Sequence, residues 1–116
     1  MGFAVKYIQG NGGSDMIGQL RIYTINKGMM DSWLKLFRED VVPRVKEAGM
    51  GIQTAWVNEE RTQFVWIRTF GDKSEIESKE AAFYGTDWWK QNVDVVRGHI
   101  AHREIVLIER FLPDGA

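Results

Sequence analysis

One short segment, residues 63–70 with the sequence QFVWIRTF, constrains the fold more than any other part of the chain. Its β-branched and aromatic side chains are typical of a strand. Strand alternation divides its apolar side chains between two faces, with Val65 and Ile67 on one and Phe64, Trp66 and Phe70 on the other. A strand with one face in water alternates apolar and polar residues. Both faces of this strand therefore need a cover.

Apolar periodicity and turn residues divide the rest of the chain into further elements. In order, we predict a strand at 16–25, a helix at 29–48, strands at 51–58 and 63–70, a helix at 72–84 that resumes at 88–96, and a strand at 103–111. This β-α-β-β-α-β order predicts an α+β, ferredoxin-like fold. In that fold both helices cover one face of a four-stranded antiparallel sheet.

Proline, glycine and potential capping residues predict where the helices bend, begin and end. Pro43 should kink or split the first helix, because proline lacks a backbone donor and crowds the preceding turn. Gly49 suits the position just past the end of that helix. Asp72 or Ser74 is the expected cap of the second helix, and Asp87 the expected cap of the piece that follows it.

Because the helices cover one face only, the second apolar face of strand 63–70 requires another partner. An identical chain is the simplest candidate, since two-fold dimers dominate soluble oligomers. We expect the helices to cover the set with Val65, together with Leu20 and Ile22 of the first strand. The set with Trp66 is then expected to face a homodimer partner through the open face of the sheet.

The first strand, within LRIYTI at 20–25, carries Arg21 and Tyr23 on one face. In the expected arrangement they face the dimer side, beside Trp66 and Arg68 of the neighbouring strand. Arginine binds carboxylates bidentately and stacks on rings, while Tyr and Trp add hydrogen bonds and apolar surface. These four residues predict a pocket for a small anionic or aromatic ligand on this face of the sheet.

A structural interpretation competes with the ligand pocket. Arg21 and Arg68 can instead pair with Glu104 or Glu109 of the last strand and lock the sheet or the dimer. A buried arginine without a partner is costly, so each of the two needs one.

Conventional catalytic motifs are missing, and only weak candidates for acid–base chemistry remain. His99 and His102 are the only histidines, and their spacing is weak evidence for a metal site without a third ligand. We therefore expect no metal and no cofactor. If the chain is an enzyme, Tyr23 or His102 is the candidate acid–base group.

Taken together, these segments resemble the NIPSNAP family within the dimeric α+β barrel superfamily. The resemblance is carried chiefly by LRIYTI at 20–25, by Pro43 inside its helix and by FVWIRTF at 64–70, and it extends from Met16 to Phe111. It implies two ferredoxin-like chains whose sheets face each other in a barrel. It implies no agreed set of catalytic residues.

Three functions are compatible with this resemblance. The first is the binding of a small anionic or aromatic ligand in the barrel cleft. The second is a cofactor-independent monooxygenase or isomerase, as in other members of the superfamily. The third is an interaction or assembly module that holds no ligand. The first two functions need a cavity open to solvent beside Arg21, whereas the third fills that space with side chains.

Composition limits the partners and the cellular setting. The net charge is −1 with interleaved signs, so we expect no nucleic acid partner. The chain has no cysteine and no apolar run of the ~20 residues that a membrane span needs. A cytoplasmic location without membrane attachment is the default expectation. We predict a flexible leader at 1–15, one domain at 16–112 and a tail at 113–116.

Overall fold

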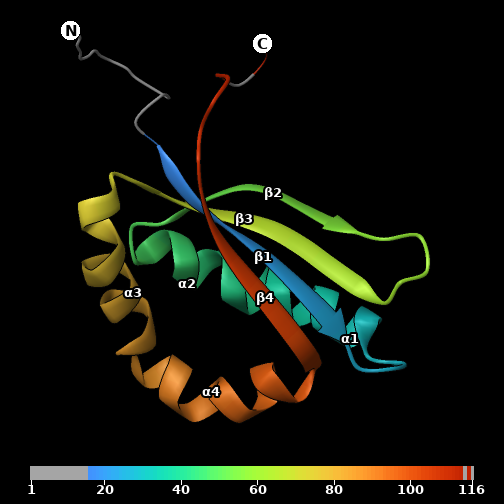
Figure 1. Cartoon of the computed structure of the whole chain (residues 1–116). Coiled ribbons are helices and arrows are strands. Elements are labelled where there is room, and N and C mark those ends of the chain that lie inside the picture. Colours follow the sequence, from blue (N-terminus) through green and yellow to red (C-terminus); the bar gives the residue numbers. More distant parts are fainter. Residues whose placement is uncertain (1–15, 114, 116) are drawn as a thin grey trace, which may run out of the picture.

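Four strands form one layer and the helices a second layer in the computed structural model, which describes residues 16–113 and 115 (Figure 1). The strands are β1 (Ile17–Ile25), β2 (Gly51–Val57), β3 (Gln63–Gly71) and β4 (Ile100–Glu109). The predicted leader at 1–15 lies outside the described residues. No helix in the described part of the chain is long and apolar enough to cross a membrane.

The sheet confirms the predicted α+β, ferredoxin-like fold. Its strand order is β2-β3-β1-β4, and every neighbouring pair is antiparallel. Arg21 of β1 lies directly across from Trp66 of β3, so the two strands are neighbours as expected. Strand β4 begins three residues earlier than predicted, because Ile100 already pairs with Ile25 of β1.

The first helical region is split before Pro43, as its proline predicts. It consists of α1 (Met30–Leu36), a π-helical turn η2 (Phe37–Val41) and α2 (Val42–Glu47). The amide of Val42 bonds to the carbonyl of Phe37, five residues back. We attribute the wide turn to the proline, which removes one α-helical donor and needs room in the preceding turn.

Gly49 ends α2 as expected. Its φ is 93°, in the left-handed region that favours glycine. The amide of Gly49 bonds to the carbonyl of Lys46, and the amide of Met50 bonds to the carbonyl of Val45. This pair of bonds is the Schellman motif, which satisfies carbonyl groups at the end of a helix.

The second helical region comprises η3 (Lys73–Glu75), α3 (Ile76–Tyr84) and α4 (Asp87–Gly98). Asp72 caps the start of this region, and it forms a reciprocal capping box with Glu75. The predicted cap at Asp87 is wrong. Thr86 is the cap of α4, because its hydroxyl accepts the hydrogen bond from the amide of Trp89.

The expected assignment of the two sheet faces is also wrong. The helices cover the face that carries Trp66, and the set with Val65 lies on the open face. The side chains buried beneath the helices alternate along two strands: Gln19, Arg21, Tyr23 and Ile25 on β1, and Phe64, Trp66, Arg68 and Phe70 on β3. The aromatic rings of this face supply the larger apolar volume, which the helices need in order to pack.

The open face of the sheet carries an apolar patch. Register and alternation place Leu20, Ile22, Val65 and Ile67 on it, with Trp56 of β2 and Val106 of β4 across the neighbouring strands. Trp56 is 67% exposed. We call this set the open-face patch. Within residues 16–113 and 115, one face of the sheet with exposed apolar side chains lacks a cover as expected, and the two faces are exchanged.

Candidate functional site

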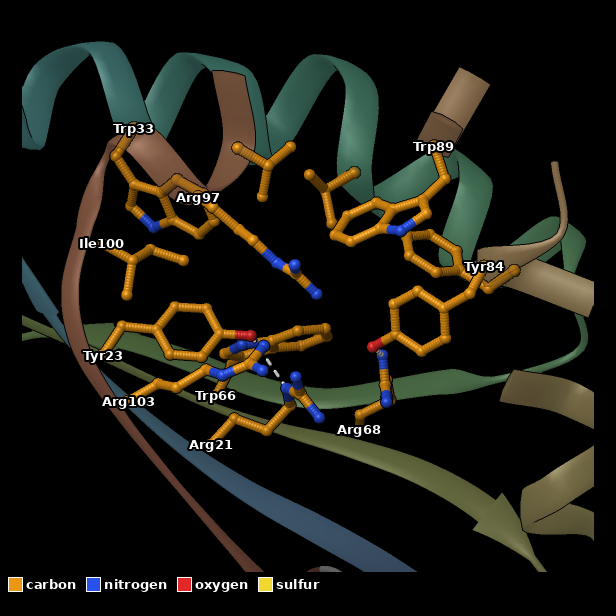
Figure 2. Close-up of a pocket in the computed structure, with 13 residues that line it drawn as sticks. Arg21, Tyr23, Trp33, Trp66, Arg68, Tyr84, Trp89, Arg97, Ile100 and Arg103 are labelled. Carbon is orange, nitrogen blue, oxygen red and sulfur yellow. Dashed lines mark hydrogen bonds between the residues drawn. The ribbon is translucent and has the colours of Figure 1, made fainter. Parts of the chain in front are cut away.

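A cavity of about 30 Å³ lies between the helix-covered face of the sheet and the helices (Figure 2). Strands β1 and β3 form its floor, and residues of the helical layer and of β4 complete it. The lining residues are Arg21, Tyr23, Trp33, Val41, Trp66, Arg68, Phe83, Tyr84, Trp89, Val96, Arg97, Ile100 and Arg103. All four predicted ligand-binding residues therefore line one cavity. That cavity belongs to the single chain and does not lie at the open face.

Arg21 is 3% exposed, and its hydrogen-bond partners are neutral. Its Nε donates to the hydroxyl of Tyr23 at 2.8 Å, and its Nη1 donates to Oε1 of Gln19 at 2.7 Å. Its guanidinium carbon lies 5.7 Å from the ring centres of both Tyr23 and Trp66. No carboxylate pairs with Arg21 among the described residues. Among the described residues, its positive charge is stabilised by hydrogen bonds and aromatic rings, without an opposite charge.

Arg68 is 1% exposed and has a carboxylate partner. Its Nη2 lies 2.8 Å from Oε2 of Glu80 on α3, and its Nη1 donates to the hydroxyl of Tyr84 at 3.1 Å. Because the side chain of Glu80 is 30% exposed, water weakens the attraction within this ion pair. Arg68 is consequently anchored to the helical layer, whereas Arg21 is not.

Gln19 connects the two arginines. Its Oε1 accepts from Nη1 of Arg21 and, at 2.9 Å, from Nη2 of Arg68. Its Nε2 donates to Glu80 at 3.0 Å, which fixes the orientation of the amide. Two like charges therefore share one neutral acceptor, so Gln19 is a positioning residue for both guanidinium groups.

The cavity is rich in positive charge. Arg97 of α4 and Arg103 of β4 are exposed side chains that point toward the same space as the buried Arg21 and Arg68 (Figure 2). None of the lining residues is acidic. The one carboxylate that pairs with any of these four arginines, in the part of the chain the structure describes, is Glu80. Charge of one sign in a largely apolar site favours an anion.

Three buried donors in the described chain lack any hydrogen-bond partner: Nε1 of Trp33, Nε1 of Trp66 and Nε of Arg68. All three belong to residues that line the cavity. Buried polar atoms are normally satisfied, and an unpaired one costs free energy. Unpaired donors around a cavity indicate that an acceptor belongs there, supplied by water or by a ligand.

The structure separates the two acid–base candidates. Tyr23 lines the cavity, whereas His102 lies across from Thr24 on the opposite face of the sheet and does not line it. His99 is buried beside the ring of Trp33, where its ring nitrogens bond to Ser32 and to the carbonyl of Val95. These contacts assign His99 to the packing of α1 against α4.

The predicted partners of the arginines on the last strand are not their partners in the structure. Glu104 lies across from Ile22, on the open face, and Arg68 pairs with Glu80 instead. Sequence reasoning missed Glu80, Tyr84, Arg97 and Arg103. No local signal indicates which helical side chains approach a strand, because that depends on how the helices dock.

No group of three or more His, Cys, Asp or Glu side chains suited to a metal ion occurs among residues 16–113 and 115. The donor set of the cavity consists of guanidinium groups, indole N–H groups and two phenol hydroxyls. Such groups bind anions and hydrogen-bond acceptors rather than cations. The fold and the site together define a ferredoxin-like α+β protein with a cationic cavity between its layers.

Comparison with known families identifies the particular family. The NIPSNAP family profile matches residues 18–109, so the chain belongs to the NIPSNAP family, as its sequence predicts. A NIPSNAP domain protein from Burkholderia xenovorans is 18% identical, with a TM-score of 0.75 over 84% of this chain and 99% of that chain. A NIPSNAP family protein from Agrobacterium tumefaciens is also 18% identical, with a TM-score of 0.78 over 94% and 95%.

The same fold occurs outside the NIPSNAP family. An antibiotic biosynthesis monooxygenase is 17% identical, with a TM-score of 0.61 over 83% of this chain and 99% of that chain. At this identity the likeness concerns the fold alone. None of the curated proteins matches the chain.

Proposed function

We propose that this NIPSNAP chain binds a small organic anion in the cavity between its sheet and its helices. The observation that carries the proposal is Arg21, a buried charge with only neutral partners. Burying a charge is costly unless an opposite charge accompanies it. A bound carboxylate supplies that charge, and the guanidinium group of arginine matches a carboxylate bidentately.

The surroundings of Arg21 support the same ligand class. The unpaired indole N–H groups of Trp33 and Trp66 are donors without an acceptor, and a carboxylate has acceptor capacity to spare. Aromatic rings make up much of the wall, which suits an organic anion. The proposed site differs from the expected one, because it lies within one chain instead of between two.

The proposal is tested by thermal unfolding with benzoate as the anionic probe and benzamide as its neutral counterpart. Benzoate should raise the melting temperature of the wild-type protein, whereas benzamide should not. Arg21→Met should abolish the benzoate effect, and the exposed Arg38→Met serves as the matched control that retains it. Equal benzoate effects in wild-type protein and in Arg21→Met would refute an anion site at Arg21.

A second candidate function rests on Tyr23. Its oxygen accepts from Arg21 inside the cavity, so its own O–H remains available to a bound molecule. A tyrosine in that position suits proton transfer to or from a ligand held by the arginines. The position of Tyr23 supports the alternative function, a cofactor-independent monooxygenase or isomerase with Tyr23 as the acid–base group. Tyr23→Phe removes this hydroxyl. A variant that still binds benzoate but no longer converts a substrate of the wild-type protein would support catalysis rather than binding alone.

The open-face patch supports a homodimer. An apolar patch of this kind on a sheet face in water is unfavourable, and a second copy of the chain covers it by two-fold symmetry. Native mass spectrometry of the untagged protein measures the number of subunits and any co-purified small molecule in one experiment. A monomer would contradict the dimer proposal and leave the cavity proposal intact, because the cavity belongs to one chain.

A further inference from the structure

We infer that the anion held by the cavity is amphipathic: its carboxylate enters the cavity and its apolar part lies on Ile105 and Leu107 of β4. This inference rests on the proposed anion site and specifies its ligand. The juxtaposition that carries it is a pair of exposed aliphatic side chains on β4, one of them directly across from the buried cation Arg21.

The register of the sheet places this apolar pair. Ile105 lies directly across from Arg21, and Leu107 directly across from Gln19. Side chains of directly paired residues point to the same face and have Cβ atoms ~4.5–5.5 Å apart. Ile105 and Leu107 therefore lie on the helix-covered side of the sheet. Arg103 precedes Ile105 by two residues on the same face of β4, and it lines the cavity.

The protein's own helices do not cover these two side chains. Ile105 is 45% exposed and Leu107 is 48% exposed, although they share a face with the buried Gln19 and Arg21. Strand β4 is the edge of the sheet, so no further strand of the described residues shields them. Aliphatic surface is thus left in water next to a cavity lined by four arginines.

The size of the cavity determines which part of a ligand it accepts. A water molecule needs ~10–15 Å³ of such space, so about 30 Å³ holds roughly two waters. Two waters correspond to the two oxygens of a carboxylate. The remainder of a larger ligand must lie outside the cavity, where Arg97 and Arg103 reach toward the same space (Figure 2).

Charge complementarity selects the occupant of this surface. A purely apolar segment from another chain would cover Ile105 and Leu107 but would leave Arg21 without an opposite charge. An anion without an apolar part would satisfy Arg21 and leave the aliphatic pair in water. A monocarboxylate with an acyl or aryl body meets both requirements.

The test is an NMR titration of the whole chain with a series of straight-chain carboxylates: acetate, butanoate, hexanoate and octanoate. In the wild-type protein each added methylene should tighten binding by about two- to fourfold, as expected for burial of aliphatic surface. In the double variant Ile105→Ser/Leu107→Ser, acetate should bind as before. The ratio of octanoate to acetate affinity should fall at least about tenfold.

Two controls accompany the double variant. Val106→Ser removes a side chain of similar exposure, 47%, that points to the opposite face of the same strand. It should keep the wild-type dependence on chain length. Ile105→Val/Leu107→Val retains aliphatic surface and should keep most of that dependence. Dispersed amide spectra establish that each variant is folded.

The outcomes separate this inference from the proposed function. An unchanged octanoate-to-acetate ratio in the serine double variant overturns the inference and leaves the anion site standing. A changed subunit number in that variant, with no change in the ratio, assigns the pair to a second copy and also overturns it. Failure of every carboxylate, acetate included, to bind the wild-type protein overturns the proposed function itself.

Discussion

The Nε of Arg21 donates a 2.8 Å hydrogen bond to the hydroxyl oxygen of Tyr23, two residues further along the same strand. Residues i and i+2 of a strand share a face, so both side chains extend along the floor of the cavity. The bond holds the guanidinium group in place without neutralising it. We interpret the pair as the preformed part of the proposed anion site.

Arg21→Met should stabilise the unliganded protein. The substitution removes a buried charge that has no acidic partner and leaves no other charge unpaired. We expect the free energy of unfolding to rise by on the order of 1 kcal/mol, measured by urea denaturation. Arg38→Met, on the exposed side of the helical layer, should leave it unchanged. A clear loss of stability would assign Arg21 to the structural role instead.

Glu80→Gln should have the opposite effect. It deprives the buried Arg68 of its carboxylate, so the free energy of unfolding should fall by about 1–3 kcal/mol, less than for a fully buried pair because Glu80 is partly exposed. A bound anion then restores the missing charge. The benzoate-induced rise in melting temperature should therefore exceed that of the wild-type protein.

Glu77→Gln is the matched control for Glu80→Gln, because Glu77 is an exposed glutamate of the same helix. It should change neither the stability nor the benzoate effect. If Glu80→Gln weakened the benzoate effect, the ion pair with Arg68 would be part of the binding geometry, and the simple charge argument would be wrong.

Val65→Asp should prevent dimerisation. The side chain lies at the centre of the open-face patch, where a carboxylate in an apolar interface would lose its hydration without gaining a partner. Light scattering after size-exclusion chromatography should give a dimer for the wild-type chain and half that mass for the variant. Ile105→Ser, on the other side of the sheet, should retain the dimer mass. Equal masses for both proteins would contradict dimerisation through this face.

Acid should weaken the capping box at Asp72. Hydrogen bonds from the hydroxyl of Ser74, and then from its backbone amide, lower the pKa of Asp72 below its ordinary value. A lowered folded-state pKa stabilises the fold above the unfolded-state pKa, and that stabilisation is lost as the pH falls through the folded value.

The measurement is the free energy of unfolding of the wild-type protein and of Asp72→Ala at pH 7 and at about pH 3, below the ordinary aspartate pKa. The wild-type protein should be more stable than the variant at pH 7, and the difference should shrink at low pH. A difference that is the same at both pH values would show that the charge of Asp72 contributes nothing.

Much of the fold was predictable because local signals carry it. Alternation marks the strands, and the order of elements implies the ferredoxin-like topology, which places β1 beside β3 and so Arg21 beside Trp66. Pro43 and Gly49 act through their own backbone restrictions, whatever surrounds them. Arg21, Tyr23, Trp66 and Arg68 line one cavity for the same reason: strand neighbours and alternation suffice to place them together on one face.

The sequence by itself thus determined the elements, their order, the strand neighbours and the presence of two apolar sheet faces. Only the tertiary structure decided which face the helices cover. Alternation has a period of two and is unchanged when the faces are exchanged, so it cannot distinguish Val65 from Trp66 as the buried side. Docking of the helices made that choice. It brought Glu80, Arg97 and Tyr84 to the two strand arginines, which turned a predicted surface between two chains into a cavity inside one.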